Sequence, residues 1–215
     1  MRLHSSSVHE YYRNQTYGYS EPMMQSLCMG SCVWGAVADK LISDGVYDHV
    51  VVATTGWPGA PLEILEKGSS FEENAYEVLR RTYEGIKSVK GGVDGVLYHQ
   101  GESDNLALQG DKGDATRNDY GGRFKGLVDD LEADTGEAVK WWISRTTGCK
   151  DMGVDDVLGE IQFGIADEVE GIERGPNTDA MGFGRDRRYD ECHFSSPIMV
   201  DLVAEAWVES IKNGA

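Results

Sequence analysis

Apolar residues recur along the chain with two alternating spacings, one typical of helices and one of buried strands. Apolar positions three or four residues apart predict amphipathic helices over 31–42, 72–89, 116–134, 154–168 and 196–212. Short apolar runs between them predict strands over 50–53, 93–97 and 139–144, and the run at 50–53 suits a strand buried on both faces. Residues 1–30 are expected to be irregular, and residues 174–189 are expected to form a loop.

Strands and helices alternate without a repeat or a linker. This order predicts one α/β domain over residues 1–215, built on a mostly parallel sheet. Ligands of such sheets bind beyond the carboxyl ends of the strands. The segments expected to carry function are therefore 54–60, 98–105, 145–152 and 186–195.

The charge balance argues against two classes of partner. The chain has 20 basic and 37 acidic residues, a net charge of −17, which repels nucleic acid and anionic membrane surfaces. No apolar run approaches the roughly 18 residues that a membrane span needs. Residues 1–10 lack the apolar stretch of a signal peptide, so the sequence does not assign a compartment.

The four cysteines are too few for a disulfide scaffold, and their spacing fits no zinc motif. Buried thiols are the default expectation. A bridge between Cys149 and Cys192 stays open, and no metal or cofactor is expected.

Two loops carry side chains suited to acyl transfer. Asp190 and His193 are three residues apart before the last helix, where the carboxylate can orient the imidazole for proton transfer. Gln100 follows a predicted strand and can present an N–H to a developing oxyanion. Glu102 lies in the same loop, where a charge needs a partner.

The loop after the first predicted strand adds a backbone donor. It reads Gly56-Trp57-Pro58-Gly59-Ala60-Pro61, and because proline has no N–H, Gly59 is the expected donor.

Together the segments GWPGAPLE, YHQGESD, ISRT and RYDECHFS resemble the SGNH hydrolases, and more narrowly the sialate O-acetylesterase and carbohydrate esterase family 6 branch. The resemblance runs from about Ser31 to the C-terminus. It implies a three-layer α/β/α fold with a mostly parallel, flavodoxin-like sheet. It also implies a carbohydrate O-acetylesterase that acts by serine acyl transfer on an acetylated sugar or polysaccharide, incomplete here because the segment that carries the nucleophile is absent. Members of the family are often secreted.

The family's functional residues carry over by motif. His193 matches the general base and Asp190 its orienting acid, while Gln100 and Gly59 match the oxyanion hole. The resemblance also implies that Glu102 and Arg145 form a supporting pair beside the site. Glu102 is expected to be largely buried and paired with Arg145 or with backbone N–H groups, because a lone buried charge is costly. Pro58 replaces the family's first loop glycine, so a donor at that position is lost.

The nucleophile is unknown, because the family's opening strand with its G-Q-S-N or G-D-S serine has no counterpart here. Ser5, Ser6 and Ser7 lack the preceding glycine and the following helix. Ser31 caps a predicted helix with no strand before it, and Ser103 has no family precedent as nucleophile. The sequence therefore predicts little or no esterase activity from this chain alone.

In the family this first strand is central, between the strands matching 50–54 and 93–98. Its loss would leave two parallel edges unpaired, at about 1–3 kcal/mol for each buried group without a partner. Three alternatives stay open: another polypeptide supplies the strand, the fold is weakened, or the first 30 residues rearrange to fill the gap.

The sequence also leaves two alternative functions open, which are a non-catalytic carbohydrate-binding relative and an inactive truncated fragment. The oligomeric state stays open.

Overall fold

The computed structural model describes residues 7–12, 33–57, 59–69, 75–108, 113–149, 152–184, 186–188, 190–194 and 196–214, of which 7–12 are described by their backbone. The chain divides into two compact units. Unit 1 consists of Met1–Gly56 and Gly182–Ala215, and unit 2 consists of Trp57–Met181.

Unit 1 combines a two-stranded antiparallel sheet with two packed helices. Strand β1 (Ser7–Tyr12) pairs with β2 (His49–Thr54), and Ser7 lies opposite Thr54. Helix α1 (Val33–Ser43) packs against α7 (Pro197–Asn213). The rings of Trp34 and Trp207 are 5.5 Å apart at this contact. Helix α7 begins where the Ser196 side chain accepts a hydrogen bond from the Met199 N–H, a typical N-cap.

Strand β1 corrects the expectation of an irregular segment over residues 1–30. Its sequence, SVHEYY, mixes β-prone and polar residues and contains no continuous apolar run. An antiparallel strand needs no such run, because one of its faces can stay in water. The N-terminal residues thus supply a partner for β2. Residues 49–53 of β2 are half-buried, whereas the sequence suggested burial on both faces.

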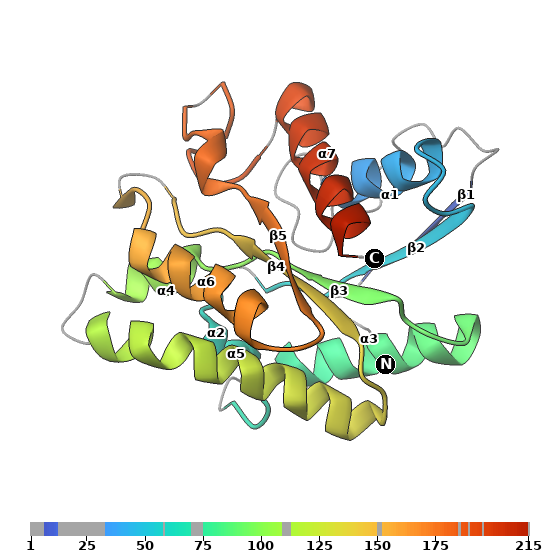
Figure 1. The fold of residues 1–215 in the computed structure, drawn as a ribbon, viewed down its shortest axis with the longest axis horizontal. Coiled ribbons are helices and arrows are strands. Elements are labelled where there is room, and N and C mark those ends of the chain that lie inside the picture. Colours follow the sequence, from blue (N-terminus) through green and yellow to red (C-terminus); the bar gives the residue numbers. More distant parts are fainter. Residues whose placement is uncertain are drawn as a thin grey trace. The chain divides into compact units, whose positions relative to one another are not determined.

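Unit 2 contains a three-stranded parallel sheet in the order β3-β4-β5, formed by Gly95–Tyr98, Lys140–Arg145 and Ile172–Asn177. Its long helices are α3 (Ala75–Lys90), α5 (Gly113–Thr135) and α6 (Asp156–Glu168). Helix α6 packs against β4 and β5 and against α5, which also contacts α3 (Figure 1). The structure therefore confirms an α/β fold with a small parallel sheet flanked by helices.

Strand β5 was not expected, because residues 174–189 were predicted to be a loop. Its sequence, IERGPN, contains glycine and proline, which usually mark turns. Proline is tolerated on an edge strand, and β5 is at the edge of this sheet. The short helices α2 (Leu62–Leu65) and α4 (Glu102–Leu108) and the 3-10 turn Asp179–Met181 were also not predicted.

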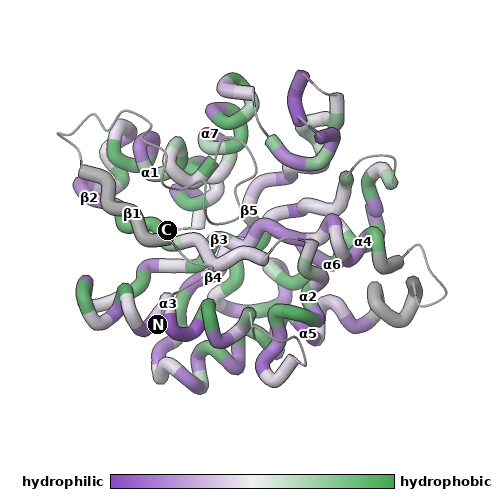
Figure 2. Tube along the Cα trace, turned by 180° about the vertical axis from the view of Figure 1, so that it is seen from behind, coloured by the Kyte–Doolittle hydropathy of each residue, from purple (hydrophilic) through white to green (hydrophobic). Residues whose placement is uncertain are grey.

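The core of unit 2 is rich in aromatic side chains packed around the central strand. Trp141 of β4 is fully buried, with the ring of Phe124 at 5.6 Å in an edge-on contact. Figure 2 shows hydrophobic and hydrophilic residues alternating along the helices, as amphipathic packing requires. No helix in the described part of the chain is long and apolar enough to cross a membrane.

Candidate functional site

Asp190 and His193 form a hydrogen-bonded pair in the turn before α7. His193 Nδ1 is 2.7 Å from Asp190 Oδ2, and Asp190 Oδ1 accepts from the backbone N–H groups of His193 at 2.7 Å and Cys192 at 3.0 Å. The His193 side chain is 47% exposed. An ionised carboxylate only accepts, so Nδ1 carries the proton and Nε2 carries the basic lone pair.

The carboxyl group of Asp190 stays ionised across the neutral range. Burial raises its pKa, but the hydrogen bonds from the backbone and ring of His193 and from the Cys192 N–H outweigh burial and hold the pKa at about 2. Asp190 can therefore orient the His193 ring and stabilise the imidazolium that forms during proton transfer.

A buried arginine supports this turn from within unit 1. Arg188 is fully buried between the rings of Phe183 and Phe194, with its guanidinium carbon 4.3 and 4.2 Å from the ring centres. Its Nη1 donates to the Cys192 carbonyl at 2.8 Å, and its Nε donates to the Gly182 carbonyl at 3.1 Å. Arg188 also pairs with Phe194 in an antiparallel bridge, so it closes the loop that carries Asp190 and His193.

Sequence reasoning missed Arg188. The one signal for it is an arginine flanked at short range by two phenylalanines, and that pattern does not show that the side chain is buried. Between Asp190 and His193, Glu191 adopts a left-handed backbone with φ 65°, which also marks the turn as specifically shaped.

Two cysteines, one in each unit, correct the expectation of buried thiols. Cys149 and Cys192 are both disulfide-bonded, and both are buried. Sequence spacing does not show which sulfur atoms a fold brings to bonding distance, so the default expectation failed. Cys28 and Cys32 lie outside the described residues.

In unit 2, the side chain of Gln100 joins two loops. Its Nε2 donates to the Ala60 carbonyl at 2.9 Å and to Asp104 Oδ2 at 2.5 Å, while its Oε1 accepts from the Tyr98 hydroxyl at 2.8 Å. Both amide hydrogens are thus engaged in this structure. An oxyanion would have to replace one of these two acceptors.

Gly59 is exposed. It precedes Ala60, whose carbonyl accepts the hydrogen bond from Gln100. Its φ of +65° lies in the left-handed region, which favours glycine. Pro58 lies outside the described residues. The structure therefore places the Gly59 loop and the Gln100 loop side by side within unit 2, as the sequence predicts.

Asp104 is a second residue that sequence reasoning left without a role. It is buried, and its carboxylate oxygens lie 3.0 and 3.3 Å from the Leu62 N–H, in addition to the bond from Gln100. Burial raises the pKa of this carboxyl above its ordinary value, although the bonds from Gln100 and Leu62 oppose the shift. Asp104 therefore holds the start of α2 and the Gln100 side chain together.

We expect Asp104→Ala to destabilise the chain by about 2 kcal/mol, because the Leu62 N–H and the Gln100 amide both lose an acceptor. Asp104→Asn keeps an acceptor and is expected to cost less.

The raised pKa of Asp104 also predicts a pH dependence of stability. A folded-state pKa raised above 3.8 means that Asp104 favours folding most below pH 3.8 and loses that contribution as the pH rises. Urea unfolding should show that the free energy of unfolding of wild type, relative to that of Asp104→Asn, is higher at pH 4 than at pH 7. A difference between the two proteins that does not change with pH would contradict this prediction.

A buried polar network lies beneath the Gln100 loop. Gln162 of α6 donates to the Gln100 carbonyl at 3.0 Å and accepts from the Thr146 N–H at 2.9 Å. The hydroxyl of Thr146 contacts those of Ser144 and Thr178, each at 2.7 Å. These bonds tie together the carboxyl ends of β3, β4 and β5.

The predicted pair between Glu102 and Arg145 is not present. Arg145 instead bonds to Asp156 at 2.5 Å and Glu160 at 2.7 Å, two acids of α6. An acid at 156 and another at 160 lie one helical turn apart, so both reach the same guanidinium. Glu102 begins α4 and is half-buried rather than largely buried.

The candidate nucleophiles gain no support from the structure. Ser103 is half-buried in the first turn of α4, and Ser31 lies outside the described residues. Asp190 and His193 belong to unit 1, whereas Gly59 and Gln100 belong to unit 2. The approach of these two pairs to one another stays a prediction.

Comparison with known proteins supports the fold alone. No family model matches the chain. No curated protein matches it either. Among solved structures, a protein from Arabidopsis thaliana shares 23% sequence identity with a TM-score of 0.53. The match covers 72% of this chain and 57% of the Arabidopsis protein, so the chain spans less than two thirds of that protein's length.

Proposed function

We propose that this chain is a carbohydrate O-acetylesterase of the SGNH type, in which His193 acts as the general base. The observation that carries the proposal is the bond between His193 and an ionised Asp190, which fixes the tautomer that a base needs. The three-layer sheet arrangement of that family and the acetylated sugar or polysaccharide substrate belong to the same proposal. Their support is the motif resemblance.

In the proposed reaction, Nε2 of His193 takes a proton from the attacking hydroxyl, and the new bond forms at the ester carbonyl carbon. Asp190 stabilises the resulting imidazolium. The N–H of Gly59 and one amide hydrogen of Gln100 donate to the oxyanion. The ester C–O bond then breaks, and His193 returns the proton to the departing sugar oxygen.

Water is the attacking group in this proposal, because no serine with the family's surroundings is found in the sequence. Water attack yields acetate directly and forms no acyl-enzyme. General-base assistance contributes roughly 10²–10⁴-fold, so the expected hydrolysis is slow.

A second candidate is a carbohydrate-binding relative without catalysis. One observation favours it: both amide hydrogens of Gln100 already donate to Ala60 and Asp104. In a binding module these bonds would simply fix the shape of a sugar cleft.

Hydrolysis of p-nitrophenyl acetate separates these proposals. We expect slow turnover without an initial burst, retained in Ser31→Ala and Ser103→Ala and lost in His193→Ala. Rapid turnover abolished by either serine substitution would contradict the water route. Absence of turnover, with calorimetric binding of an acetylated oligosaccharide, would favour the binding module.

A further inference from the structure

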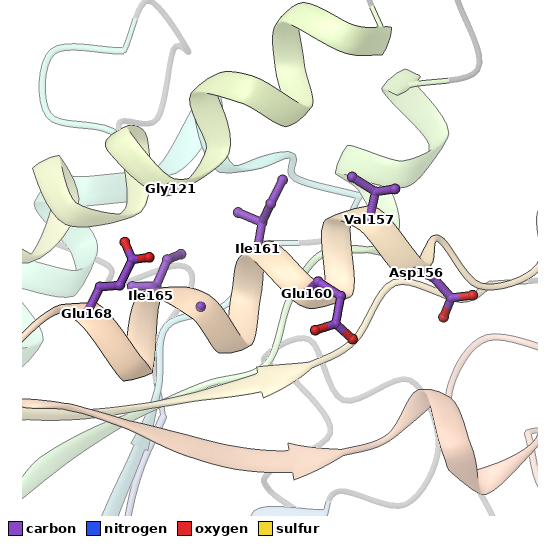
Figure 3. Close-up of a pocket in the computed structure, with 8 residues that line it drawn as sticks. Gly121, Asp156, Val157, Glu160, Ile161, Ile165 and Glu168 are labelled. Atoms are coloured by element: carbon purple, nitrogen blue, oxygen red, sulfur yellow. The ribbon is translucent and has the colours of Figure 1, made fainter.

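An open groove of about 560 Å³ runs along α6 beside α5 in unit 2 (Figure 3), and none of the residues of the proposed reaction lines it. Val157, Ile161 and Ile165 of α6 line it, spaced four residues apart, so the apolar stripe follows one face of the helix. Val157 is 57% exposed. From Val157 to Glu168 the groove is about 16 Å long, the length of three helical turns.

Two helical glycines keep this groove open. No atom lies within 4 Å of the position that a Cβ would take on Gly164, and at Gly121 the nearest are side-chain carbons of Ile161 and Ile165 at 3.8 Å. Alanine would therefore fit at both positions, and in a helix it is more stable than glycine by roughly 0.5–1 kcal/mol. Packing within unit 2 does not explain these glycines, whereas an occupant of the groove would.

The charges around the groove define the occupant. Asp156, Glu160 and Glu168 line it together with the apolar stripe, and in Figure 3 Asp156 and Glu160 extend to the other side of α6 from Val157 and Ile161. Arg145 bonds to Asp156 and Glu160, so these two acids are paired, whereas Glu168 adds a negative charge at the far end of the apolar stripe. A second copy of a chain with net charge −17 would be repelled.

We propose that the groove between α5 and α6 docks a positively charged amphipathic helix of a partner polypeptide. The apolar face of that helix covers Val157 and Ile161, and its lysine or arginine side chains reach Glu168, the acid of the lining that Arg145 does not hold. Burial of exposed apolar surface drives the association, and the acidic edge selects a basic partner. This inference does not depend on the proposed esterase activity.

A fluorescein-labelled peptide of about four helical turns, with leucines on one face and lysines on the other, is the probe. Fluorescence anisotropy with wild type should show saturable binding that weakens as salt is added. We expect Gly164→Leu, which fills the groove, and Glu168→Lys, which reverses a charge at its edge, to weaken binding at least about tenfold.

Two matched controls separate this site from general attraction to an acidic protein. Gly126→Leu places the same side chain on another open helical position of α5, and Glu209→Lys makes the same charge change on α7. Both should bind the peptide within about twofold of wild type. Equal weakening in all four variants, or no weakening in any, would overturn the proposal. So would a dimer, detected by sedimentation, that Gly164→Leu dissociates.

Discussion

Gly101→Ala is expected to destabilise the chain by about 3–5 kcal/mol, among the largest effects of any single substitution. An ideal Cβ at this position would lie 2.0 Å from the Thr146 carbonyl oxygen and 2.4 Å from Gln162 Nε2. The Thr146 carbonyl follows the buried strand β4, and Gln162 is fully buried, so neither atom can move aside cheaply. Relief of the overlap would require breaking the bond from Gln162 to the Gln100 carbonyl.

Urea unfolding followed by circular dichroism measures this effect. Gly126→Ala is the control, because no atom lies within 4 Å of a Cβ there. In a helix this control should be neutral or stabilising by up to about 1 kcal/mol. An unfolding midpoint for Gly101→Ala equal to that of the control would show that the Gln100 loop is not packed as described.

Arg188→Ala is expected to cost about 3 kcal/mol of stability and to impair any reaction that uses His193. The substitution removes two hydrogen bonds to the Cys192 and Gly182 carbonyls and leaves a gap between two phenylalanine rings. Because Cys192 also donates to Asp190, the Asp190–His193 geometry should loosen with it.

Arg188→Lys tests whether the stability depends on the planar guanidinium group or only on its positive charge. A lysine keeps the charge but cannot reproduce both hydrogen bonds and the stacking, so we expect it to recover less than half of the loss. Arg187→Ala is the control, since Arg187 is half exposed. Nitrogen NMR can follow the proton on His193 Nδ1. This proton should exchange with solvent at the wild-type rate in the control and faster in Arg188→Ala. Equal exchange in both would contradict a positioning role.

The sequence predicted the regular elements whose packing follows simple periodicity. Helices α1, α3, α5, α6 and α7 and strands β2, β3 and β4 lie where apolar spacing indicated, within a few residues. Strands β1 and β5 escaped prediction because neither has a continuous apolar run. Pairing within a sheet made them strands, and that pairing is not visible in local sequence.

The candidate site shows a similar limit. The Asp190–His193 bond follows from residues three apart, so local sequence suffices for it. The contacts of Asp104 with Leu62 and of Arg188 with Phe183 depend on the path of the loops. Arg145 illustrates the same point. The motif resemblance paired it with Glu102, whereas in the structure it pairs with Asp156 and Glu160 of α6.

The central claim is that His193 and Gln100 act on one ester although they belong to different units. A double-mutant cycle on acetate release from p-nitrophenyl acetate tests it most directly, with His193→Ala, Gln100→Leu and the double variant. Residues that act together in one site lose activity non-additively. We predict that each single variant is slower than wild type and that the double variant is no slower than His193→Ala. Losses that multiply, or a wild-type rate equal to that of the double variant, would contradict the account.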